Sequence, residues 1–204
     1  MGVVALDSLL DQRRVWKGQP AARLSSGLST GHTQLDERLP SGGWPEAALS
    51  EILIEAEGIG ELQLLWPALA RLTTAAERVV LVAPPYVPYP QRWMAAGIDL
   101  RHLALIEASG KEALWAAEQC LRSGSCGAVL CWPKQADDRA LRRLQVAAET
   151  GQTRAFAYRP LKEALNPSPA ALRIAVDARP AQLRVLKSRG GFVDPAAIPV
   201  SAWH

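Results

Sequence analysis

The chain has 204 residues, of which 49% are hydrophobic and 21% are charged, and its formal net charge is +3. This length supports one sizeable core with appended segments, and the apolar content excludes a disordered chain. No run of about 18 apolar residues predicts a membrane span, and no basic stretch at the start indicates a signal peptide. Three scattered cysteines match neither a disulfide framework nor a zinc motif. We therefore expect a reduced, cytoplasmic protein.

The first expected element is an amphipathic helix over residues 3–17, which Gly18 and Pro20 bring to an end. Residues 1–24 then form this helix and a linker. The helix either docks on a partner or folds back on its own core, and we prefer docking because residues 18–26 read as a tether. The candidate contact residues of the helix are Leu6, Leu9, Leu10 and Trp16.

Strands and helices alternate from residue 47 onward, after a short helix expected at residues 33–39. This alternation predicts an α/β fold with a mostly parallel central sheet flanked by helices. Its last two strands form an antiparallel hairpin at one edge, and the domain covers residues 25–186. The expected strands are 49–54, 78–83, 102–106, 128–132, 154–158, 172–177 and 182–187, and the later helices are 91–96, 111–122 and 138–150.

The turn after the first of these strands has the position and length of a phosphate-binding loop. Such a loop needs a lysine for the phosphates and a hydroxyl for Mg²⁺, but these two positions hold Glu61 and Leu62. Carboxylates at Glu55, Glu57 and Glu61 would repel a triphosphate. We therefore expect a degenerate loop, in which the acids favour a helix N-terminus instead. Its defining residues are Glu57, Gly58, Gly60, Glu61 and Leu62.

Short motifs on either side of this turn resemble those of RecA-like proteins. Ser-Thr-Gly at residues 29–31 and Gly-Gly-Trp-Pro at residues 42–45 resemble the entry to the RecA-like core. Residues 97–103 resemble the segment after its second core strand, and residues 126–133 occupy the place of the Walker B strand. The resemblance implies a RecA-like core.

The same resemblance assigns the family's ATPase positions one at a time. The Walker lysine falls on Glu61, the Walker B aspartate on Trp132, and the acid that activates water near Pro84 and Pro85. Each of these functional groups is therefore missing. The resemblance implies a scaffold without ATP hydrolysis, with no catalytic residue and no cofactor. The three scattered histidines form no catalytic or metal-binding group.

Over nearly its full length the chain resembles the ImuA family of translesion-synthesis-associated proteins. The matching features include Val-Trp-Lys-Gly at residues 15–18 and Val-Leu-Lys-Ser-Arg-Gly-Gly at residues 185–191. The resemblance implies an SOS-induced adaptor that works with the polymerase-like ImuB, with RecA and, indirectly, with a replicative-type error-prone polymerase. The SulA family of cell-division inhibitors, which bind FtsZ, is also similar but shorter, and it remains the alternative.

Two further regions are candidate interaction surfaces. Residues 139–190 hold 11 Lys or Arg against 3 Asp or Glu, whereas the rest of the chain holds 12 against 17. This asymmetry indicates either an acidic partner, including weak contact with DNA, or a solvated basic face. The candidate basic contacts are Arg139, Arg142, Arg143, Arg159 and Lys162. In the C-terminal extension, residues 187–204, the candidates for partner contact are Lys187, Arg189, Phe192 and Trp203.

Overall fold

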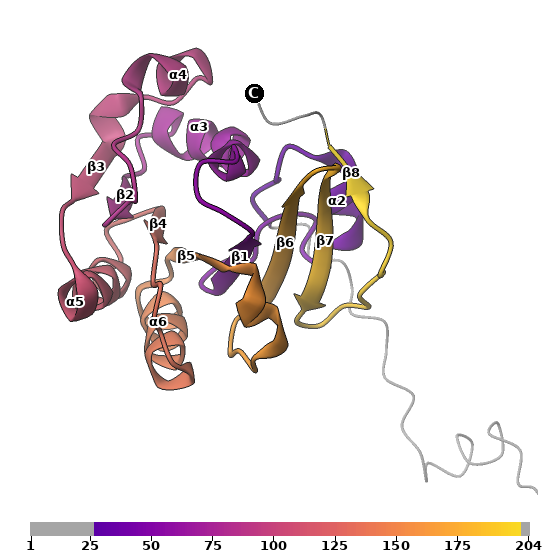
Figure 1. Ribbon diagram of the computed structural model, residues 1–204. Coiled ribbons are helices and arrows are strands. Elements are labelled where there is room, and N and C mark those ends of the chain that lie inside the picture. The colour runs from indigo at the N-terminus through magenta and orange to yellow at the C-terminus, as the bar shows by residue number, and fades with distance from the viewer. Residues whose placement is uncertain (1–26, 201–204) are drawn as a thin grey trace, which may run out of the picture.

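An eight-stranded sheet forms the centre of the protein, and the computed structural model describes residues 27–200 of the chain. The strand order is β3-β2-β4-β5-β1-β6-β7-β8 (Figure 1). Strands β1 to β6 pair in parallel, whereas β7 is antiparallel to both of its neighbours. The strands are β1 (Leu49–Ile54), β2 (Val79–Val82), β3 (Leu103–Ile106), β4 (Ala128–Cys131), β5 (Arg154–Pro160), β6 (Leu172–Ala178), β7 (Ala181–Ser188) and β8 (Ile198–Pro199).

Helices cover both faces of this sheet (Figure 1). One apolar core lies between the sheet and α2, α3 and α4, and a second lies between the sheet and α5 and α6. None of the helices within residues 27–200 combines the length and the apolar character needed to cross a bilayer. The helices are α2 (Thr33–Arg38), α3 (Trp66–Thr74), α4 (Pro90–Ala95), α5 (Gly110–Arg122) and α6 (Asp138–Gly151), with 3₁₀ turns η1 (Glu61–Leu64), η2 (Leu100–His102) and η3 (Leu161–Leu165).

The α/β class, the mostly parallel sheet and the edge hairpin expected from the sequence are confirmed. Short strands such as β2 and β4 are fully buried, which is why they read as continuous apolar runs. The N-terminal helix expected at residues 3–17 lies outside the described residues. Strand β8 was not predicted from the sequence; it pairs with β7 and returns residues 198–199 to the sheet.

The Gly-Gly-Trp motif at residues 42–44 holds the segment around Leu28 against the core. The N–H of Trp44 donates to the carbonyl of Leu28 at 2.7 Å, and its indole is fully buried with its edge toward Phe156, 5.1 Å between ring centroids. A Cβ added to Gly43 would lie 2.3 Å from the Leu28 carbonyl oxygen. Only glycine allows the two backbone segments to approach this closely.

Candidate functional site

The backbone of the loop after β1 donates a hydrogen bond to a carboxylate of the same chain. Gly58 and Gly60 have φ angles of +82° and +94°, which turn the chain sharply between β1 and η1. The N–H of Gly58 donates to Oε1 of Glu61 at 3.2 Å, and only 3% of Glu61 is exposed. An amide that faces phosphate in a nucleotide-binding loop thus already faces an anion within the chain.

The α-helix that follows does not begin at this loop, which corrects the expected placement of the acids at a helix N-terminus. Glu61 lies instead in the 3₁₀ turn η1, and α3 begins only at Trp66. Pro67 stands in the first turn of α3, where its missing N–H costs no helical hydrogen bond. The positive end of the helix dipole is therefore displaced from the loop.

An aromatic ring stands at the end of β4, at the position where a Walker B strand carries its carboxylate. Trp132 follows β4, and its ring stacks on Tyr158 of β5 with 5.0 Å between centroids and 10° between planes. Burial, together with the nearby charge of Glu61, raises the pKa of Tyr158 well above its usual value. The phenol therefore stays protonated at neutral pH. Among the described residues, neither Trp132 Nε1 nor the Tyr158 hydroxyl has a hydrogen-bond partner.

Two hollows flank Trp132 at the carboxyl ends of the strands. A groove of about 230 Å³ separates the loop residues 58–63 from residues 84–93. A hollow of about 380 Å³ lies on the other side, lined by Tyr158 and by the ion pair of Lys134 and Glu57 at 2.9 Å. Within residues 27–200, no group of three His, Cys, Asp or Glu side chains is placed to hold a metal ion.

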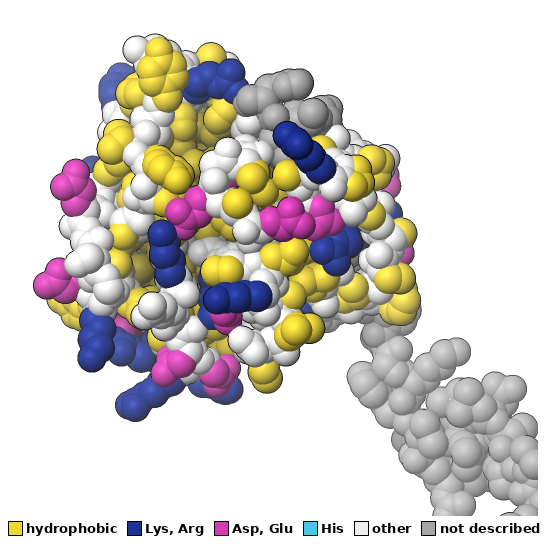
Figure 2. Space-filling view, in the orientation of Figure 1, with side chains coloured by type: hydrophobic (Ala, Val, Ile, Leu, Met, Phe, Trp, Pro, Cys, Tyr) yellow, Lys and Arg dark blue, Asp and Glu magenta, His cyan; other side chains and the backbone are white. Residues whose placement is uncertain are grey.

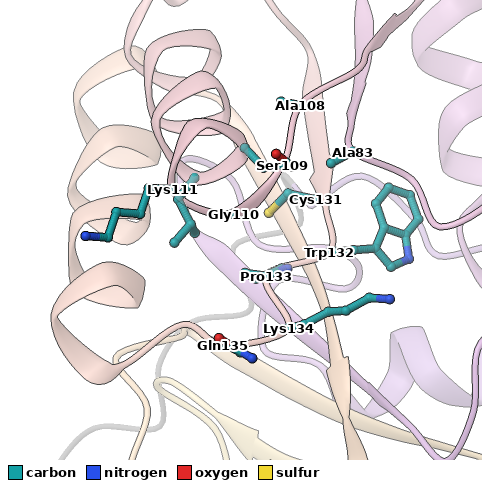
Figure 3. A pocket seen from close by; sticks show the side chains of 12 residues that line it. Ala83, Ala108, Ser109, Gly110, Lys111, Cys131, Trp132, Pro133, Lys134 and Gln135 are labelled. Atoms are coloured by element: carbon teal, nitrogen blue, oxygen red, sulfur yellow. The ribbon is translucent and has the colours of Figure 1, made fainter.

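A third hollow, of about 520 Å³, lies at the N-terminal end of α5 (Figure 3). Figure 3 shows the ammonium group of Lys111 pointing away from the other labelled side chains. The buried Cys131 thiol also lines this hollow and donates to the carbonyl of Phe156 at 3.6 Å. Burial raises the pKa of Cys131 to about 12, so this thiol is not a nucleophile at neutral pH.

Arg159 is not available to a phosphate backbone, and its prediction as a basic contact is wrong. Only 3% of this residue is exposed, and its guanidinium donates to Glu51 Oε1 at 2.7 Å and to Glu163 Oε2 at 3.1 Å. Arg173 pairs with the second oxygen of Glu51, also at 2.7 Å. The buried carboxylate of Glu51 is thus paired with a buried arginine on each of its two oxygens.

This buried network also holds the segment that follows β5. Arg173 donates to the backbone carbonyls of Glu163 and Asn166 at 2.7 and 3.0 Å, and Arg159 donates to that of Ala136 at 2.7 Å. The network thereby fixes η3 over β1. Neither Glu51 nor Arg173 was predicted from the sequence, although a single acid in the otherwise mostly apolar strand β1 was a signal for a buried ion pair.

The other predicted basic residues are exposed but differ in their partners. Arg142 pairs with Asp138 at 3.0 Å, and Arg143 pairs with Glu118 of α5. Arg139 shares helix α6 with them, whereas Lys162 lies in η3. These residues therefore do not form one row along a single element.

The C-terminal candidates are divided between bonded and exposed side chains. Lys187 donates to the carbonyl of Ser168 at 2.6 Å, and burial lowers its pKa. Arg189 donates to the carbonyl of Pro169 at 3.0 Å, while 86% of Phe192 is exposed. Four predicted contacts of the N-terminal helix and one of the C-terminus lie outside the described residues. They are Leu6, Leu9, Leu10, Trp16 and Trp203.

No protein-family model and no curated protein matches the chain. Among solved structures, the chain is similar to the crystal structure of SulA from Pseudomonas aeruginosa, with 29% sequence identity and a TM-score of 0.48. The match covers 57% of this chain and 99% of that chain. With a TM-score below 0.5, this likeness does not define a function for the chain.

Proposed function

We propose that this chain is a non-catalytic, RecA-like accessory protein of SOS-induced translesion DNA synthesis in the cytoplasm. It binds an ImuB-type, polymerase-like partner, RecA or both, and reaches a replicative-type error-prone polymerase through them. The observation that carries the non-catalytic part is the buried carboxylate of Glu61 at the loop amide of Gly58. The assignment to translesion synthesis rests on the resemblance to the ImuA family.

Electrostatics oppose nucleotide binding at this loop. Two like charges about 4 Å apart repel by about 4 kcal/mol at the effective dielectric constant of a protein surface. A phosphate at the loop would face Glu61 at this range, without the lysine and the hydroxyl that normally offset its charge. A repulsion of that size lowers affinity by about a thousandfold.

Titration with Mg-ATP is expected to show a dissociation constant above about 1 mM and no phosphate release. Glu61→Gln removes this repulsion and is expected to improve affinity by up to about a thousandfold, still without turnover, because Trp132 replaces the Walker B aspartate. Isothermal titration and a phosphate-release assay make the measurement, with the exposed Glu37→Gln in α2 as the matched control. Micromolar binding with turnover by the unaltered chain would contradict the proposal.

Partner choice is tested by parallel pull-downs of the full chain against ImuB, RecA and FtsZ at low salt. Retention of ImuB or RecA supports the adaptor, whereas retention of FtsZ with inhibition of its GTPase supports the SulA-type alternative. Deletion of residues 1–18 tests the N-terminal helix. At the other end Phe192→Ala is preferable to deletion, since residues 198–199 belong to the sheet. Absence of both ImuB and RecA from the pull-downs would overturn the adaptor.

A further inference from the structure

Exposed apolar side chains gather on the loop that joins β2 to α4. Tyr86, Val87 and Tyr89 are 65%, 80% and 62% exposed, and Met94 of α4 is also exposed. Figure 2 shows hydrophobic side chains gathered at the top of the view, where Figure 1 places α4. Prolines at positions 84, 85, 88 and 90 restrict the loop backbone, so little conformational entropy is lost when a partner covers it.

The groove described above runs between this loop and Glu61. Tyr86 and Tyr89 line it from the loop, and Trp66, Trp93 and Trp132 contribute further aromatic surface. Its volume of about 230 Å³ equals that of about eight water molecules at about 30 Å³ each, which is enough for one long side chain.

The two sides of the groove carry opposite charges. Glu61 lines the loop side, and its buried Oε2 has no hydrogen-bond partner among the described residues. The guanidinium of Arg92 lies on the α4 side, 5.9 Å from the ring centroid of Trp66. A buried carboxylate oxygen that accepts no hydrogen bond lowers the stability of the protein. A ligand that donates a hydrogen bond to this oxygen would therefore bind favourably at Glu61.

We propose that this groove receives an arginine or lysine side chain of a protein partner, presented between apolar residues. The cationic end pairs with Glu61, the aliphatic stem lies against the aromatic walls, and the flanking apolar residues cover Tyr86 and Val87. This inference rests on the proposed adaptor function and specifies the surface and the partner's chemistry. Single-stranded nucleic acid fits less well, because its phosphates would meet the carboxylate of Glu61.

Three fluorescently labelled peptides test the charge requirement on the full-length chain. The probe is acetyl-Leu-Trp-Arg-Val-Leu-amide, and the other two carry citrulline or glutamate in place of arginine. Because citrulline is neutral and nearly isosteric, the arginine peptide is expected to bind at least about tenfold more tightly in a fluorescence-anisotropy titration. Glu61→Gln is expected to abolish that difference, whereas Glu37→Gln preserves it.

A second variant tests the aromatic surface independently of Glu61. The double substitution Tyr86→Ser and Tyr89→Ser changes exposed side chains only, so circular dichroism is expected to be unchanged while all three peptides lose affinity. Equal binding of the arginine and citrulline peptides would overturn the inference, as would tighter binding of the glutamate peptide or no binding at millimolar concentration. So would a thymidine oligonucleotide that binds and loses affinity in the double variant.

The two proposals fail in distinguishable ways. If ImuB or RecA is retained in the pull-downs while the peptides show no charge preference, the adaptor stands and the groove assignment fails. If the arginine peptide binds as expected but neither protein is retained, the groove remains a site for a basic side chain and the translesion assignment fails.

Discussion

Replacement of Glu51 by glutamine is expected to lower the free energy of unfolding by about 3–5 kcal/mol. The carboxylate is fully buried in β1 and pairs with Arg159 and Arg173, each at 2.7 Å. Neutralising it leaves two buried guanidinium groups with a single acid, Glu163, whose carboxylate pairs with Arg159 and not with Arg173. Most of the loss therefore comes from positive charges left buried without a counter-charge.

Equilibrium denaturation in urea measures this effect, and thermal unfolding is expected to shift downward by about 10 °C for a chain of this length. Arg142→Ala is the matched control, because it breaks the exposed pair with Asp138 and is expected to cost about 0.5 kcal/mol or less. A loss below about 1 kcal/mol for Glu51→Gln would show that the network does not stabilise the fold.

The same network changes the meaning of the basic final third of the chain. Several of its cations form ion pairs with acids of the same chain. Arg159 and Arg173 pair with Glu51, and Arg184 donates to Asp177 at 2.9 Å. Arg143 pairs with Glu118 across two helices. The excess of positive charge in residues 139–190 is thus partly a set of internal ion pairs. Binding to DNA through these particular side chains is correspondingly less favoured.

Sequence patterns predicted the sheet well because buried parallel strands impose a simple requirement. Each of β2 and β4 must be apolar on both faces, and a run of four such residues is visible without any tertiary information. The two-residue strand β8 lacks such a run, and Pro199 lowers its strand propensity. Its pairing depends on β7 lying beside it, which a local pattern does not encode.

The candidate site was predictable in its position and its missing groups, but not in its detailed contacts. A strand, a glycine turn and the identity of Glu61 are all visible in the sequence. The burial of that carboxylate against the Gly58 amide depends on how η1 packs, and the aromatic groove forms only when residues 84–93 fold back toward the loop. Segments separated by many residues meet there, so spacing along the chain carries little signal.

Substitution of Gly43 by alanine is expected to destabilise the protein by about 3 kcal/mol or more, whereas Gly42→Ala is expected to cost about 1–2 kcal/mol. A Cβ at Gly43 would meet the Leu28 carbonyl at 2.3 Å, and backbone atoms there have little room to move. Gly42 has a φ of +67° but nothing within 4 Å of an added Cβ, so only backbone strain is at stake. Urea denaturation of the two neighbouring variants separates steric contact from strain. Equal losses of stability would show that the close approach of the Leu28 backbone does not require glycine at position 43.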